Sequence, residues 1–150
     1  MTKEEADGVK VTVGPDGSKL WYLHGVLHRD DGPAAEFSDG NKLWYSFGNL
    51  HRENGPAVEY QSGTKEWWRD GKLHREDGPA VESRSGRKEW WRDGKQHRED
   101  GPAIEWADGR KEYYLNGEEW EDGASIIARR KAGKSLPKKK PLCPCPFKKP

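Results

Sequence analysis

The sequence predicts an all-β protein in which short β-hairpins repeat to form a single-layer, twisted antiparallel array of about ten strands. The first observation is a strict period of 23 residues, which places one histidine in each of four similar segments, at His28, His51, His74 and His97. A glycine turn keeps the same step, at Gly17, Gly40, Gly63, Gly86 and Gly109. The third observation is composition: eight Trp and five Tyr accompany one Met and 31% hydrophobic residues, which suits a thin sheet held by large rings.

One unit of the repeat reads as a strand, a tight turn, a second strand and a longer connector. The first strand is expected at 57–60 and the second at 65–69, with a Ser-Gly turn between them. An Asp-Gly pair and the connector LHREDGP then lead to the next unit. The prolines of the connectors are expected to start strands, where a missing N–H is tolerated: Pro33, Pro56, Pro79 and Pro102.

The chain divides into four parts by composition. Residues 1–8 are expected to be disordered, and residues 9–123 form the repeat domain. Residues 124–133 can form a short helix, and residues 134–150 form a disordered, proline-rich basic tail. The outer units depart from the repeat, as capping units do, and Trp120 stands where the next histidine is due. The tail also carries Cys143 and Cys145, which are too few to staple the fold.

Charge is divided between the repeats and the tail. Nine of the 27 basic residues and none of the 26 acidic residues follow residue 123, which gives the tail +9 and the preceding part −8. A basic tail can contact phosphate, an anionic lipid surface, an acidic protein face or its own acidic repeats. Because the sequence shows neither a signal peptide nor a transmembrane stretch, a cytoplasmic location is expected.

Two aromatic columns run along the array on neighbouring residues, which point to opposite faces of a strand. One column contains Trp21, Trp44, Trp67, Trp90 and Tyr113, and the other contains Tyr22, Tyr45, Trp68, Trp91 and Tyr114. Both columns can be structural, or the second can form an exposed binding platform rimmed by charges such as Glu66. On that reading the candidate binding residues are Tyr45, Trp68, Trp91, Tyr114, Arg69 and Arg92.

The recurring histidine, arginine and acid do not favour catalysis, because an active site normally breaks the symmetry of a repeat. Nothing in the sequence forms a nucleophile, a metal cluster or a phosphate loop, so neither an enzyme nor a bound cofactor or metal is expected. The histidines are instead expected to stabilise turns by hydrogen bonding. The connector arginines are expected to form inter-repeat ion pairs with nearby acids: Arg29, Arg52, Arg75 and Arg98.

The period and the segment WRDGKLH, Trp68 to His74, resemble the MORN (membrane occupation and recognition nexus) repeat, which also has 23 residues. The resemblance covers residues 9–120 and is closest to divergent repeats of bacterial, bacteriophage and giant-virus proteins. After the histidine this chain has Arg, an acid and Gly-Pro-Ala, where the common repeat has Gly-x-Gly. The resemblance implies a virus-encoded adaptor or inhibitor of a host defence protein, acting in the host cytoplasm.

The expected function is therefore that of a non-enzymatic protein-interaction module. A sheet face would bind a protein partner, and the basic tail with Lys138, Lys139 and Lys140 would strengthen the contact. Open sheet ends also permit a homodimer. Two other hypotheses stay open at this point: sequestration of a nucleotide between Trp, Arg and His side chains, and binding of lipid or nucleic acid through the tail.

Overall fold

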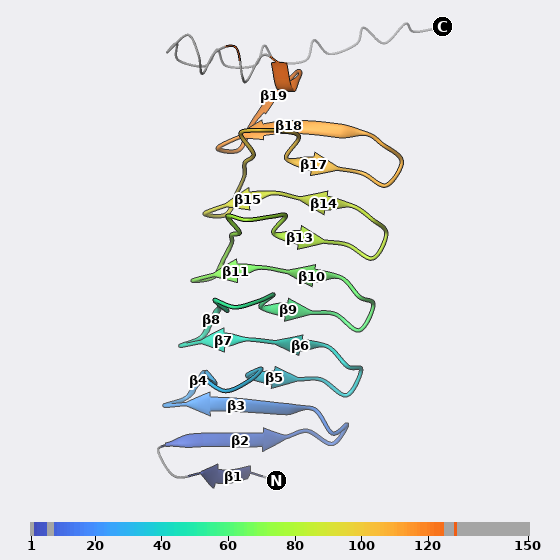
Figure 1. Cartoon of the computed structure of the whole chain (residues 1–150). Coiled ribbons are helices and arrows are strands. Elements are labelled where there is room, and N and C mark those ends of the chain that lie inside the picture. The colour runs from blue at the N-terminus through green and yellow to red at the C-terminus, as the bar shows by residue number, and fades with distance from the viewer. Residues whose placement is uncertain (1, 6–7, 125–127, 129–150) are drawn as a thin grey trace, which may run out of the picture.

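The chain forms an open, elongated array of stacked strands, with the first strand at one end and the last hairpin at the other (Figure 1). The computed structural model describes residues 2–5, 8–124 and 128. Its main sheet has 13 strands, in the spatial order β1 (Thr2–Glu5), β2 (Val9–Val13), β3 (Lys19–Leu23), β5 (Ala35–Glu36), β6 (Lys42–Leu43), β9 (Val58–Glu59), β10 (Lys65–Glu66), β13 (Val81–Glu82), β14 (Lys88–Glu89), β17 (Ile104–Glu105), β18 (Lys111–Leu115) and β19 (Glu118–Trp120), while β4 (Val26–Leu27) pairs with β3. The predicted all-β hairpin array is confirmed.

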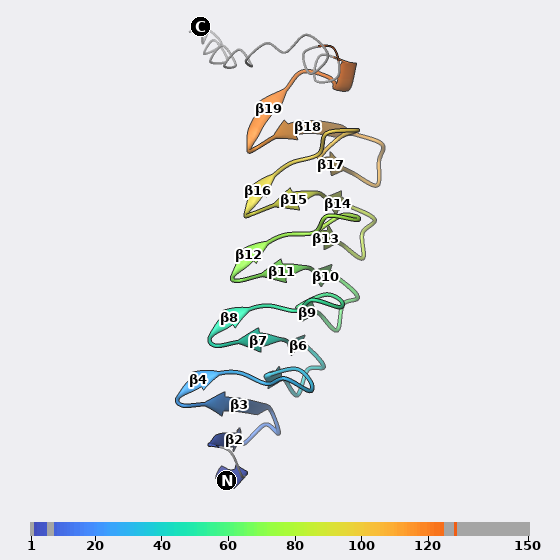
Figure 2. The same ribbon diagram turned by 60° about the vertical axis from the view of Figure 1, so that its left-hand side comes forward.

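Each inner repeat contributes four short strands, and not the two expected from the sequence. The segment 65–69 is interrupted at Trp67, so that β10 stays in the main sheet while the chain continues as β11 (Trp68–Arg69). A second hairpin then forms, because β11 pairs with β12 (Lys72–Leu73). The equivalent hairpins are β7 (Tyr45–Ser46) with β8 (Asn49–Leu50) and β15 (Trp91–Arg92) with β16 (Lys95–Gln96). The described residues therefore form 19 strands, and the second hairpins stand in a row along one side of the array (Figure 2).

Turn chemistry explains the second hairpin. Asp70 and Gly71 both have positive φ, at 49° and 74°, as a two-residue hairpin turn of type I′ requires. Asp and Gly are residues that adopt this conformation at low cost. The Asp-Gly pair, expected to lead into the connector, instead closes β11 onto β12.

The core is thin and consists mainly of small side chains. The four alanines that follow the connector prolines are completely buried: Ala34, Ala57, Ala80 and Ala103. Val58 and Ile104 are also buried in the main sheet. The carbonyl of each alanine accepts a hydrogen bond from the backbone N–H of a tryptophan at 2.8 to 2.9 Å, as Ala80 does from Trp67. These four positions are completely enclosed, and each is occupied by the methyl side chain of alanine.

The two faces of the main sheet differ in polarity. Lys65 pairs with Glu59 on one side and with Glu82 on the other, so one face carries alternating Lys and Glu. On the opposite face Glu66 pairs with Val58 and Val81. Trp67 receives Arg75, which also binds Glu82 of the first face, whereas Nε1 of Trp68 donates to Glu66 of the second face.

The two ends of the chain differ in how they close the array. Residues 2–5, which the sequence analysis assigns to a disordered segment, form β1 and pair with β2. The free edge of β2 offers backbone donors and acceptors, which explains why a polar segment becomes ordered there. Within the expected helix at 124–133, the described residues Ala124 and Ala128 are helical. The tail predicted at 134–150 lies outside the described residues.

Candidate binding surface

Each connector carries an arginine that lies flat on a tryptophan ring. The Cζ atom of Arg75 lies 4.0 Å from the centre of the Trp67 ring. Nη1 of the same arginine donates to the Pro79 carbonyl at 3.1 Å and to Glu82 Oε1 at 3.0 Å, and Nε donates to Asp77 Oδ1 at 2.9 Å. The stack recurs at 3.9 to 4.2 Å in the pairs Arg29–Trp21, Arg52–Trp44 and Arg98–Trp90. A planar guanidinium is needed for this combination of stacking and fixed hydrogen bonds.

The connector glycines leave room for these arginines. A Cβ atom on Gly78 would lie 3.0 Å from Arg75 Cζ, and the equivalent distances at Gly32 and Gly101 are 2.9 and 3.0 Å. Such contacts would displace the guanidinium from the ring. The Gly-Pro-Ala sequence of each connector is therefore a packing motif, in which glycine admits arginine, proline accepts its hydrogen bond and alanine fills the core.

The connector arginines make the ion pairs that the sequence predicts, in two directions. Arg75 binds Asp77 within its own connector and Glu82 on the first strand of the next unit. A hydrogen bond from Arg75, together with its positive charge, holds the pKa of Asp77 below the ordinary value, and Arg29 does the same for Asp31. In the second connector Asn54 replaces this aspartate, while Arg52 keeps its contact with Glu59 at 3.0 Å.

The histidines hold the hairpin turn of the following repeat, which confirms the predicted turn-stabilising role. His74 Nδ1 accepts a hydrogen bond from the backbone N–H of Asp93 at 3.2 Å and lies 3.0 Å from its carboxylate. His51 makes the same contacts with Asp70. At each of these turns the residue held by the histidine has positive φ: Phe47, Asp70, Asp93 and Asn116. The histidine ladder is thus an inter-repeat connection.

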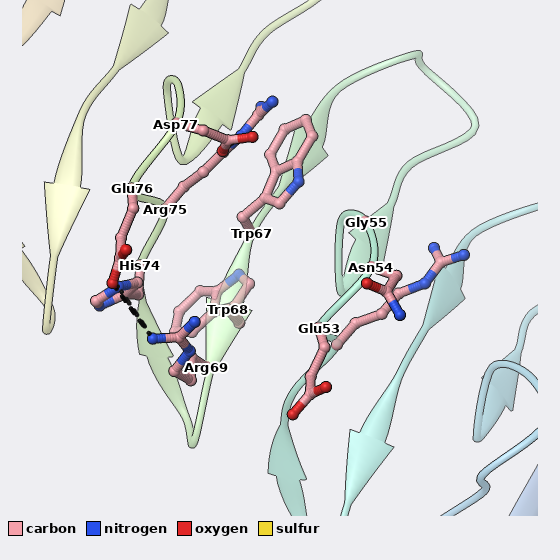
Figure 3. Close-up of a pocket in the computed structure, with 11 residues that line it drawn as sticks. Glu53, Asn54, Gly55, Trp67, Trp68, Arg69, His74, Arg75, Glu76 and Asp77 are labelled. Carbon is pink, nitrogen blue, oxygen red and sulfur yellow. Dashed lines mark hydrogen bonds and ion pairs between the residues drawn. The ribbon is translucent and has the colours of Figure 1, made fainter.

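Three equivalent hollows lie between successive connectors, one repeat apart, with volumes of about 660, 580 and 590 Å³. In the middle hollow, Glu53, Asn54 and Gly55 come from one connector and His74 to Asp77 from the next (Figure 3). Trp67 and Trp68 lie between the connectors. The hollows before and after it contain Trp44 and Trp90 at the position of Trp67.

Exposed carboxylates rim the hollows. The side chains of Asp31, Asp77 and Asp100 are 82, 83 and 85% exposed, so each can contact a ligand while one oxygen receives the arginine Nε. Further connector acids join them at the hollows: Asp30, Glu53, Glu76 and Glu99. The arginines beneath are largely buried and each pairs with a glutamate outside the hollows. The rim therefore presents exposed carboxylates at each hollow, beside the guanidinium groups of Arg69 and Arg92, and Asn54 interrupts the aspartate series.

Several candidate residues from the sequence meet in these hollows. Tyr45 lines the first, Trp68 and Arg69 line the middle one, and Arg92 lines the third. Trp91 and Tyr114 do not line them, and Lys138, Lys139 and Lys140 lie outside the described residues. The connector acids and the tryptophans of the first column were missed. The signal for them was the repeated HRxDGP segment, interpreted as a structural turn alone.

The second aromatic column has its own hydrogen bonds. Nε1 of Trp68 donates to Glu66 Oε2 at 2.8 Å, and Nε1 of Trp91 donates to Glu89 Oε2 at 3.1 Å. Tyr114 makes the equivalent contact with Glu112 at 3.3 Å. Burial, with nearby carboxylates, raises the pKa of Tyr114. These aromatic residues are half-buried, so the column is neither a sealed seam nor a fully exposed platform.

Two features are absent from the described part of the chain. Within residues 2–5, 8–124 and 128, no group of three or more His, Cys, Asp or Glu side chains is placed to hold a metal ion. The same residues contain no helix long and apolar enough to cross a membrane.

In comparison with known proteins, the chain matches no family model and no curated protein. The resemblance to MORN repeats therefore remains a prediction from the sequence.

Proposed function

We propose that this protein is a non-enzymatic interaction module that binds an extended, positively charged segment of another protein along the connectors. The observation that carries the proposal is the row of three equivalent hollows, each combining an aromatic wall with exposed carboxylates. Aromatic side chains contribute contact area, and the acids select basic groups and accelerate association. The partner is then a protein segment rich in Lys or Arg.

The spacing of the hollows favours an extended ligand. Each repeat adds two strands to the main sheet, as β9 and β10 are followed by β13 and β14. Strands are spaced about 4.8 Å apart, so successive hollows are about 9.6 Å apart. A polyproline II segment rises about 3.1 Å per residue, so three residues span about 9.3 Å. A segment with a basic residue at every third position can thus place one in each hollow.

Two other functions fit the hollows less well. The tryptophan rings that would stack on a nucleobase are already covered by the connector arginines. The rim carboxylates would repel the phosphates of a nucleotide, a nucleic acid or an anionic lipid. In keeping with the resemblance to viral repeats, we propose that the bound protein belongs to a host and that the module acts as an adaptor or inhibitor.

A titration with synthetic peptides tests the proposal. The probe is a (Lys-Pro-Pro)₄ peptide, compared with a peptide of the same composition in which the four lysines are adjacent. Isothermal titration calorimetry with the full chain is expected to show tighter binding of the first peptide. Raising the salt concentration is expected to weaken the binding, because the contacts are ionic and exposed.

A variant with three rim charges removed locates the site. The changes Asp31→Asn, Asp77→Asn and Asp100→Asn copy the natural Asn54, beside which Arg52 keeps its bonds to Pro56 and Glu59. Affinity is expected to fall about tenfold. The matched control Asp16→Ser, Asp39→Ser and Asp108→Ser removes three charges at the glycine turns, where Ser62 and Ser85 occur naturally. Equal losses in the two variants, or no binding of either peptide, would contradict the proposal.

A further inference from the structure

We infer that the C-terminal segment of the same chain, residues 129–150, docks along the connector hollows and competes with the partner. This inference rests on the proposed function, because it uses the same surface. The occupant is the basic segment that follows Ala128 in the sequence, and the receptor is the set of exposed connector carboxylates described above. Docking of this kind would make the free protein self-occupied until a stronger ligand displaces the tail.

Charge complementarity is the first argument. All 26 acidic residues precede residue 124, whereas nine basic residues follow residue 123, so the two parts carry −8 and +9. The connectors place the exposed Asp31, Asp77 and Asp100 on one edge, and further exposed aspartates lie at the glycine turns, at Asp16, Asp39 and Asp108. Tethering holds the tail near this edge at a high effective concentration, so weak individual contacts are sufficient for occupancy.

The spacing of the lysines is the second argument. Lys131, Lys134 and Lys140 lie three and six residues apart, with Pro137 at the intervening position. In a polyproline II conformation every third residue points to the same side, with a step of about 9.3 Å. Six residues then span about 18.6 Å, close to the roughly 19 Å across the three hollows, so Lys134 and Lys140 can reach the outer two hollows with Pro137 at the middle one, and Lys131 lies one step before them. The prolines at 137 and 141 also favour such an extended conformation.

The position and length of the tail are sufficient for this contact. Residue 124 follows the hairpin of β18 and β19, directly beyond the last repeat. The hollow closest to it in the array is lined by His97 to Asp100 and by the preceding connector. Crossing the two intervals between the three hollows takes about 19 Å, or about six extended residues. Twenty-two residues follow Ala128, so the length exceeds what docking requires.

The hollow nearest the tail also contains an unsatisfied polar atom. His97 lines this hollow and is 9% exposed, and its Nε2 has no hydrogen-bond partner among the described residues. The nearest carboxylate oxygen, Oε1 of Glu99, lies 3.4 Å away. At the equivalent position of the middle repeat, Nε2 of His74 lies 3.4 Å from the Arg69 guanidinium. Because Nδ1 of His97 accepts the Asn116 N–H, Nε2 carries the proton, so this open position suits a backbone carbonyl of the tail and not a lysine ammonium.

Paramagnetic relaxation in the full chain tests the inference. Cys143 and Cys145 are the two cysteines of the sequence, so Cys145→Ser leaves one site for a nitroxide label within the tail. In a ¹⁵N-labelled sample, the amide signals of Asp31, Asp77 and Asp100 are expected to broaden. Those of Gly40 and Gly63, at the turns of the opposite edge, are expected to stay sharp. Broadening at both edges, or at neither, would overturn the inference.

Two tail variants distinguish docking through the three-residue spacing of the lysines from a general electrostatic attraction between the tail and the repeats. Lys131→Ser, Lys134→Ser and Lys140→Ser are expected to abolish the broadening and to tighten binding of the (Lys-Pro-Pro)₄ peptide about threefold, by relieving competition. The matched variant with Lys138→Ser, Lys139→Ser and Lys148→Ser loses the same charge outside that spacing and is expected to keep the broadening. Equal effects of the two variants would contradict the inference.

A mixed sample distinguishes docking within a chain from docking between chains. It combines ¹⁵N-labelled protein that carries no nitroxide with nitroxide-labelled protein at natural nitrogen isotope abundance. Broadening is expected to disappear, and its persistence would overturn the inference. If the peptide binds the connectors but the tail does not reach them, the inference fails and the proposed function stands. If neither binds, both fail.

Discussion

At the scale of single residues, the connector arginine explains most of the repeated motif. Arg75 is held by the Trp67 ring, the Pro79 carbonyl and two carboxylates. The neighbouring glycine is required because any side chain there would meet the guanidinium. The residues that distinguish this chain from the common repeat, Arg-acid-Gly-Pro-Ala, thus belong to one packed unit, which also forms the walls of the hollows.

Replacing Arg75 with lysine tests this account. Lysine keeps the charge but loses the flat stack and the paired hydrogen bonds, so we expect the free energy of unfolding to fall by about 1–2 kcal/mol. Urea denaturation followed by tryptophan fluorescence measures the change. Arg69→Lys is the control, because that side chain is 54% exposed, and its effect is expected to stay within about 0.5 kcal/mol. A loss for Arg75→Lys no larger than the control would show that the stack contributes little.

At the scale of elements, the second hairpin of each repeat is the main feature that the sequence analysis did not predict. The run 65–69 reads as one uninterrupted strand, because Trp67 and Trp68 both have high strand propensity. The interruption arises from tertiary contacts: Trp67 leaves the strand pairing, donates to the Ala80 carbonyl and receives Arg75 on its ring. Such contacts with the following connector lie outside local sequence patterns. The glycine turns, in contrast, were predictable from their positive-φ requirement.

The turn between β7 and β8 contains a strained residue whose replacement is expected to stabilise the protein. Phe47 has a φ of 45° and is 65% exposed, whereas the three later repeats carry Asp or Asn at this position and the first carries His24. Phe47→Asp would relieve the cost of the left-handed conformation and keep the hydrogen bond from the backbone N–H of residue 47 to His28 Nδ1. The lost stack of Phe47 on His28 partly offsets this gain. We expect a net increase of about 0.5–1 kcal/mol in the free energy of unfolding.

Urea denaturation measures this effect, and the reverse change Asp70→Phe serves as its counterpart. The reverse variant places an aromatic residue in the same left-handed conformation, which Asp adopts at lower cost. It is therefore expected to lower stability. Destabilisation by Phe47→Asp would show that the ring stack outweighs the backbone strain.

At the scale of the whole molecule, the period of 23 residues determines the architecture. The repeat domain, the hairpin turns and the antiparallel pairing all follow from the histidine and glycine columns. The location of the candidate site was predicted in part, since the aromatic and arginine columns meet the hollows. The acidic rim was not predicted, because it depends on how each connector packs against the next one, and the sequence of a single repeat does not contain that information.

Adding one repeat tests the additivity of the array. A copy of residues 58–80 inserted after Ala80 preserves the period and adds two strands to the main sheet. The urea midpoint and the m-value are expected to rise, because more surface is buried in equivalent contacts. A copy of residues 59–80 is the control, since it lacks the buried Val58 and puts the first strand of the copy out of register. That control is expected to be destabilised, and equal stability of the two insertions would contradict a register-dependent array.

The histidine ladder gives the array a direction. Each histidine reaches forward, because His51 holds the turn at Asp70 and His74 holds the turn at Asp93. The group that holds a given hairpin is therefore synthesised 19 residues before the turn that it holds. During translation, the leading part of the molecule already presents a template when the next hairpin leaves the ribosome. The order of assembly can thus follow the order of synthesis, one repeat at a time.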